Sequence, residues 1–324
     1  MTIKEIITEI ENFAPLAYQE DYDNCGLITG QRTQTVTGAL LSLDCTEEVI
    51  DEAIANNCNL IIAHHPILFS GLKKINGNNY VERTIIKAIQ NNIAIYAAHT
   101  NLDNVKQGVN KKMGDKLGLK NLQILAPKSN LLKKLVTFVP VTHHQAVLQG
   151  LFEAGAGNIG NYSNCSFNLE GTGTFKGNND TKPFLGKPNE LSKEKEIRIE
   201  TVFEFNKEAA IIAALLKAHP YEEVAYDIYS IANKHLHIGS GMIGELEKEM
   251  NENDFLAHVK KSLLSGCLKH TKKTGKSVKK VAICGGSGRF LLKNAINSSA
   301  DAYITSDFKY HEFFDAENKL LLVD

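Results

Sequence analysis

The stretch LIIAHHP, residues 60–66, decides the fold of this chain. Four apolar or small residues run directly into two histidines and a proline, and such a short apolar run is typical of a strand buried on both faces of a parallel sheet. Pro66 cannot donate a ladder hydrogen bond and favours an extended backbone at His65, so we expect the strand to end at the histidines. Open α/β folds bind ligands at that carboxyl edge, and imidazole is the commonest metal ligand. We therefore interpret His64 and His65 as metal ligands and not merely as the end of a strand. Because neighbouring side chains of an extended segment diverge, the pair favours two ions over one shared ion.

Two further segments repeat this pattern of an apolar strand followed by polar residues, namely GALLSLD (38–44) and IAIYAAHTNLD (93–103). Helical patterns follow Thr46 and cover 81–90, so strand and helix alternate, and the carboxyl ends of the strands should meet at one edge. We expect His99 and Asp103 to lie near the two histidines there. Asp103 could cap the helix that follows or bind metal, and beside two histidines the metal ligand is the better interpretation.

Composition and charge restrict the possible partners and compartment. The chain has 324 residues, 43% of them hydrophobic and 23% charged, with a formal charge of −1. These values are ordinary for a globular protein, and we expect no nucleic-acid partner. The six cysteines form no C-x-x-C pair, and no apolar run reaches the roughly 20 residues of a membrane span. We expect a cytoplasmic protein with no membrane segment.

The pattern of predicted strands and helices changes in the middle third of the sequence. Strand patterns at 134–140, 165–175, 197–203 and 224–228, with helices at 145–154 and 208–218, give the order β-α-β-β-α-β. That order predicts a ferredoxin-like module inserted as a unit at 129–233, between residues 1–128 and 234–324 of an α/β domain. In the last third, we interpret GSGMIGE (239–245) as a glycine-rich connection. We interpret GGSGR (285–289), which follows a buried strand at 281–284, as a turn that either holds an anion or packs closely.

Several of these stretches together resemble one family. They are DNCGL (23–27), which by itself is ordinary turn chemistry, IAHHP (62–66), AHTNLD (98–103), CGGSG (284–288) and DAYITSD (301–307). The chain resembles, over essentially its whole length, the NIF-three-like family of dinuclear-metal hexameric proteins, often named GTP cyclohydrolase 1 type 2 homologues. The resemblance implies a three-layer α/β metal-binding domain interrupted by a PII/CutA-like insert, for which HPYE (219–222) is the most telling stretch.

The resemblance also implies a set of site residues. His64, His65 and Asp103 would be ligands to two divalent metal ions per subunit, with zinc, manganese, iron and cobalt equally compatible. His99 would line the same pocket as a catalytic proton carrier, and the subunits would form a toroidal homohexamer. Family members continue past the last strand into a histidine and a glutamate that complete the site, so we expect this chain, which ends at Asp324, to be a fragment lacking both.

Two classes of function remain open at this point. In the first, the protein is a metal-dependent hydrolase in which water attacks a carbon or phosphorus atom of a nucleotide or another phosphate-bearing small molecule, as in GTP cyclohydrolase or phosphoesterase chemistry. In the second, it is a non-enzymatic metal-binding oligomeric scaffold or ligand-sensing module. Metal-dependent turnover that is lost in His64→Ala favours the enzyme, whereas saturable binding without turnover favours the scaffold.

Overall fold

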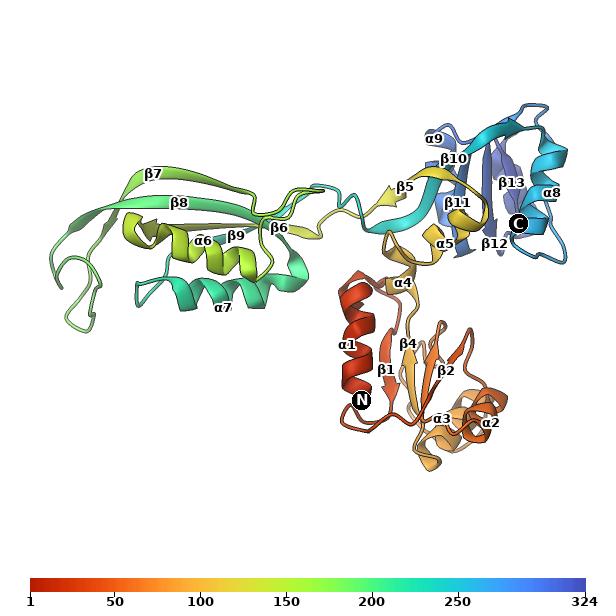
Figure 1. Cartoon of the computed structure of the whole chain (residues 1–324), viewed down its shortest axis with the longest axis horizontal. Helices are drawn as coiled ribbons and strands as arrows, with labels where there is room; N and C mark the ends of the chain where they lie inside the picture. Colours follow the sequence, from red (N-terminus) through yellow and green to blue (C-terminus); the bar gives the residue numbers. More distant parts are fainter. The chain divides into compact units, whose positions relative to one another are not determined.

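The structure of the chain is a computed structural model that describes residues 1–324. It divides into two compact units, which we describe separately (Figure 1). The first unit combines Met1–Pro127 with His237–Asp324, and the second consists of Lys128–Leu236. None of the helices has both the length and the apolar character that a membrane span requires.

The first unit contains a four-stranded sheet of order β1-β4-β3-β2, in which β2, β3 and β4 are parallel and β1 is antiparallel. Its strands are β1 (Gly26–Thr29), β2 (Ala39–Ser42), β3 (Leu60–Ala63) and β4 (Ala94–Ala97). Alternate residues of β3 face opposite layers, since Ile61 packs with α2 (Glu47–Ala55) and α3 (Tyr80–Gln90) while Leu60 packs with α1 (Ile3–Phe13). The predicted buried parallel sheet between helical layers is therefore confirmed.

The same unit contains a second sheet, of order β13-β12-β11-β10-β5. Its strands are β5 (Lys120–Pro127), β10 (Gly239–Met250), β11 (Val278–Ser287), β12 (Ala302–Ser306) and β13 (Leu321–Val323). On one face it packs against α8 (Glu252–Ser262), with α5 (Val109–Lys116) beside it. On the other face it packs against α9 (Leu292–Asn297) and the 3-10 helix η5 (Tyr310–Ala316).

Two segments of this sheet differ from the sequence-based interpretation. Residues 239–245 are not a connection but the first part of β10, and Gly285 to Ser287 form the end of β11 and not a turn. The glycines allow neighbouring backbones to approach, because a Cβ on Gly241 would lie 2.8 Å from the carbonyl oxygen of Ile283. The glycines that suggested a loop are thus used for close packing of strands.

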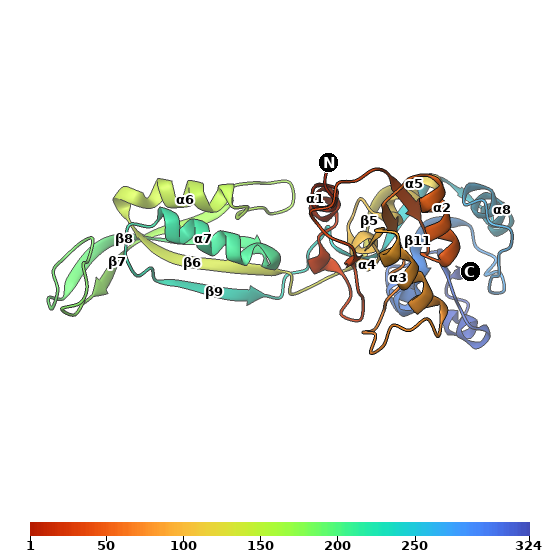
Figure 2. The ribbon, with the colours of Figure 1, turned by 90° about the horizontal axis from the view of Figure 1, so that it is seen from below.

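The second unit consists of one antiparallel sheet and two helices. Its elements, in chain order, are β6 (Leu132–Pro140), α6 (His144–Glu153), β7 (Ser166–Phe175), β8 (Ser192–Glu204), α7 (Glu208–Ala218) and β9 (Tyr226–Ile231). The sheet order is β7-β8-β6-β9, and α6 and α7 lie together on one face of it (Figures 1 and 2). Ile197 and Ile199 point into the core under these helices, so the alternate residues Glu196 and Arg198 belong to the opposite face.

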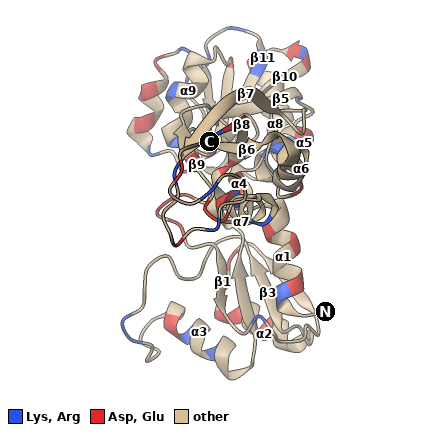
Figure 3. Ribbon diagram, turned by 90° about the vertical axis from the view of Figure 1, so that its left-hand side faces the viewer, with Lys and Arg blue, Asp and Glu red and all other residues tan.

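Acidic and basic residues are interspersed along the ribbon, as expected for a formal charge of −1 (Figure 3).

Candidate metal centre

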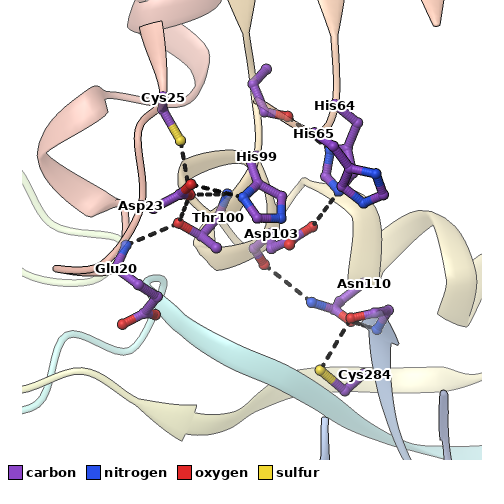
Figure 4. A network of polar contacts seen from close by, with 12 residues as sticks. Glu20, Asp23, Cys25, His64, His65, His99, Thr100, Asp103, Asn110 and Cys284 are labelled. Carbon is purple, nitrogen blue, oxygen red and sulfur yellow. Dashed lines mark hydrogen bonds and ion pairs between the residues drawn. The ribbon is translucent and has the colours of Figure 1, made fainter. Parts of the chain in front are cut away.

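Three imidazole rings meet at the carboxyl ends of β3 and β4 (Figure 4). The ring centroid of His64 lies 5.0 Å from that of His65 and 5.1 Å from that of His99, and the other two centroids are 5.4 Å apart. Each ring offers one nitrogen, and these three nitrogens lie within 4.8 Å of one another. The rings of His64 and His65 do not diverge as expected, because β3 ends at Ala63 and the pleat no longer sends neighbouring side chains to opposite faces.

The Nδ1 atom of every ring is hydrogen-bonded. The acceptors are the carbonyl oxygen of Ala98 for His64, at 2.8 Å, and Oδ1 of Asp44 for His65, also at 2.8 Å. For His99 the acceptor is Oδ1 of Asp23, at 2.9 Å. Carbonyl and carboxylate oxygens only accept, so the ring protons belong on Nδ1, and the Nε2 lone pairs remain available. Metal-binding histidines in general donate such a hydrogen bond from the ring nitrogen that does not bind the metal.

Asp103 lies beside this cluster, on the short helix α4 (Thr100–Asn104). Its Oδ1 atom is 3.8 Å from Nε2 of His64. The capping position of α4 is occupied by His99 and that of α5 by Gly108, so the side chain of Asp103 caps neither helix. Burial raises the pKa of the Asp103 carboxyl to about 6, and burial also lowers the pKa of His64. A partly buried carboxyl group beside the imidazole of His64 is well matched to a divalent cation.

Asp23, interpreted from the sequence as part of a turn, is the anchor of His99. Its side chain has an exposed fraction of 0%. Besides His99 it accepts hydrogen bonds from the backbone N–H of Thr100 at 3.0 Å, from the Thr100 hydroxyl, and from the Cys25 thiol at 3.1 Å (Figure 4). Burial raises the pKa of the Asp23 carboxyl, but these hydrogen bonds outweigh it and hold the pKa far below its ordinary value. Asp23 is therefore an anion that fixes the orientation of His99.

Asp44, which anchors His65, is the second residue of the site that was not assigned from the sequence. It follows β2 just as the histidines follow β3, and this shared position was the signal that could have identified it. The signal for Asp23 was weaker, because Asp and Asn are the ordinary residues of turns.

The cluster opens into a cavity of about 670 Å³ lined entirely by the first unit. Cys284 and Ser287 from β11 line it opposite the histidines. Four aromatic side chains, each more than half exposed, also line it, namely Tyr22, Phe69, Tyr80 and Phe290. Arg289 does not contribute, because its Nε atom donates to Oε1 of Glu312 at 3.0 Å. The segment predicted as a turn, 285–289, therefore offers the cavity backbone and hydroxyl groups, but no free guanidinium.

Comparison with known proteins gives the family of the chain. The sequence matches, over residues 1–324, the family described as Duf34/NIF3 (NGG1p interacting factor 3). The chain belongs to the Duf34/NIF3 family. A crystal structure of a Bacillus cereus protein related to NIF3 superposes with a TM-score of 0.86 at 43% identity and covers all of this chain and 87% of that one.

Curated members of the Duf34/NIF3 family are similar over most of their length. A protein of Halalkalibacterium halodurans named GTP cyclohydrolase 1 type 2 homolog is 42% identical over 96% of this chain and 84% of its own length. A Bacillus subtilis protein of the same name is 41% identical over 97% of this chain and 84% of its own length. The family and the mixed α/β fold expected from the sequence are confirmed.

Proposed function

We propose that this Duf34/NIF3 chain is a metal-dependent hydrolase that acts on a nucleotide or another phosphate-bearing small molecule. The observation that carries the proposal is the group of three histidines, each anchored through Nδ1, whose remaining ring nitrogens face one cavity. The printed names of the relatives support a hydrolytic reaction on a nucleotide.

We assign His64, His65 and Asp103 as metal ligands. Two imidazoles and a carboxylate suit zinc, manganese, iron or cobalt, and we propose two divalent ions per subunit. When bound, such ions supply Lewis acidity and make a water molecule a stronger nucleophile at neutral pH. The hydrogen bonds to Ala98 and Asp44 fix the orientations of the His64 and His65 rings. Each ring is therefore already oriented to bind an ion through Nε2.

His99 is placed to hold or move a proton at Nε2. The buried anion Asp23 accepts the Nδ1 proton at 2.9 Å and stabilises the imidazolium that would form when Nε2 takes a proton from water. Its ring nitrogen also lies within ligand distance of the other two histidines, so binding of an ion by His99 is the competing assignment.

The cavity suits a planar small molecule. Its volume of about 670 Å³ lies within the roughly 300–1,000 Å³ of small-molecule sites. The exposed aromatic side chains at its edge, Tyr22, Phe69, Tyr80 and Phe290, offer faces on which a heterocycle can stack.

The remaining parts of the proposal concern assembly and location. We propose that residues 129–233 form a ferredoxin-like, PII/CutA-like insert, and the observed strand order β7-β8-β6-β9 with two helices on one face supports this. We further propose a homohexamer that works in the cytoplasm. Six cysteines without a disulfide support a reducing compartment.

The first experiment is elemental analysis of the full chain and of the double variant His64→Ala/His65→Ala, with His311→Ala as control because His311 is exposed and lies outside the cavity. We expect about two ions per chain in the wild type and control, as in two-metal hydrolases, and none in the double variant. Equal metal content in all three proteins would overturn the proposed site. Metal loading without turnover of nucleotides or phosphoesters would identify the scaffold instead of the hydrolase.

A second variant separates the two roles of His99. If His99 is a proton carrier, His99→Gln keeps the metal and loses turnover. If it is a ligand, the same variant loses metal and turnover together.

A further inference from the structure

A second cavity, of about 570 Å³, lies in the second unit and takes no part in the metal centre. It is lined by β7, β8, the loop 176–191 that joins them, and residues 221–225. These strands and the connecting loop can be followed in Figure 1. The lining residues Glu196 and Arg198 place the cavity on the sheet face opposite α6 and α7. Its volume is typical of a small-molecule site.

The cavity contains a buried carboxylate that uses only one of its two oxygens in a hydrogen bond. Glu196 has an exposed fraction of only 8%, and its Oε1 atom accepts a hydrogen bond from the Tyr221 hydroxyl at 2.7 Å. Its Oε2 atom has no hydrogen-bond partner in the protein. The neighbouring strand provides the room for Oε2, because a Cβ on Gly173 would lie 2.0 Å from it. Half of the acceptor capacity of this carboxylate is therefore open to a cationic ligand in the cavity.

The walls around this carboxylate are aromatic. The ring centroid of Tyr221 is 5.9 Å from that of Phe175 and 6.5 Å from that of Phe184, and all three rings line the cavity together with Phe138. Faces of aromatic rings attract ammonium and guanidinium groups, and they do so more strongly when water is excluded.

The other charged residues of the lining leave an excess of negative charge. Arg198 lines the cavity, but its Nη2 atom is paired with Oε1 of Glu200 at 2.9 Å. Lys176 is the second basic residue of the lining. The acidic residues of the lining are Glu170, Glu196, Glu222 and Glu223.

We propose that this cavity binds a small organic cation that carries an ammonium or guanidinium group. The cationic head lies against Oε2 of Glu196, and its carbon atoms contact the aromatic walls. An inorganic divalent ion is a poorer match, because such ions require several oxygen ligands and the acidic side chains of the lining do not come together as a metal-holding group. The proposal does not depend on the chemistry of the metal centre.

The test compares cations with neutral molecules of the same shape on the full chain. The probes are choline against 3,3-dimethylbutan-1-ol, and n-butylguanidinium against n-butylurea, titrated by calorimetry or ligand-observed NMR. We expect at least one cation to bind saturably and about tenfold more tightly than its neutral counterpart. Glu196→Gln should weaken that cation by about tenfold, while Tyr221→Phe should have a smaller effect, because Oε1 and not Oε2 loses its donor.

The matched control is Glu194→Gln. Glu194 lies on the same strand and the same face but does not line the cavity, so its variant removes an equal charge nearby. Binding that falls equally in both variants, absence of saturable binding of either cation, or equal binding of cation and neutral probe would each overturn the proposal.

A further variant serves if Glu196→Gln fails to fold, as judged by circular dichroism. Phe184 is 48% exposed, so Phe184→Leu removes one aromatic wall without emptying a core. The preference for the cation over its neutral counterpart should fall in this variant, and an unchanged preference would contradict the proposed site.

Discussion

Replacing Asp23 by asparagine should destabilise the structure around His99 without removing a proposed ligand. Oδ1 of Asp23 accepts from His99, and Oδ2 accepts from the backbone N–H and the hydroxyl of Thr100 and from the Cys25 thiol. Asparagine has the same shape but only one acceptor oxygen. If that oxygen accepts from His99, the amide NH2 group faces the Thr100 N–H. The Thr100 hydroxyl can accept a hydrogen bond instead of donating one, but the backbone N–H can only donate.

The magnitude follows from this geometry. Leaving the part-buried Thr100 N–H without an acceptor costs about 1–3 kcal/mol, and the charge-assisted bond to His99 becomes a neutral one of roughly half its strength. We expect the free energy of unfolding to fall by about 3 kcal/mol in total. If His99 is a ligand, loss of its anchor also lowers metal affinity by about 10- to 100-fold, whereas a proton-carrying His99 leaves metal affinity unchanged.

The assay is competition for Zn²⁺ between the full chain and a chelator of known affinity, with urea unfolding measured in parallel. Asp21→Asn is the control, because Asp21 is exposed and does not line the cavity. An Asp23→Asn protein that is as stable as the wild type would refute the idea that the buried Asp23 anion anchors His99 and Thr100.

Two further predictions concern buried polar groups. The Tyr303 hydroxyl donates to the carbonyl oxygen of Gly288 at 2.6 Å in the core, so Tyr303→Phe should lower the free energy of unfolding in urea by about 1–3 kcal/mol, whereas Tyr310→Phe, at a residue with an exposed fraction of 81%, should not change it. Burial lowers the pKa of His219, which donates from Nε2 to the carbonyl oxygen of Phe138. The unfolded state therefore binds the proton more readily, so the stability from neutral His219 is complete above the unfolded pKa of about 6.5 and is lost as the pH falls below it. Hydrogen exchange of β6 peptides, corrected for intrinsic rates, should accelerate from pH 7.5 to pH 5.5 in the wild type and less so in His219→Gln; equal acceleration would exclude His219 as the titrating group.

Much of the first sheet could be predicted from the sequence because its two central strands, β3 and β4, are buried on both faces. Continuous apolar runs such as residues 60–63 leave few alternatives, and the polar residues that follow them mark the carboxyl edge. The proximity of His64, His65 and His99 followed from the topology alone.

The remaining parts depended on contacts that no local pattern reveals. The sequence predicts a turn at Asp23, because the Thr100 groups that donate to its carboxylate lie 77 residues away along the chain. The glycines of residues 239–245 suggest a loop until β5 and β11 are seen on either side of them. The capping role considered for Asp103 could be dismissed only when His99 and Gly108 were found at the capping positions.

The three hydrogen bonds that anchor the histidine rings also determine when the proposed metal centre can form during folding. They join residues 34, 21 and 76 positions apart, so each requires a different pair of segments to have met. A chain still emerging from the ribosome, or one with a single strand misplaced, would present scattered imidazoles and bind metal weakly. Under the proposed function, a tightly held ion would therefore report that these three pairs of segments have met.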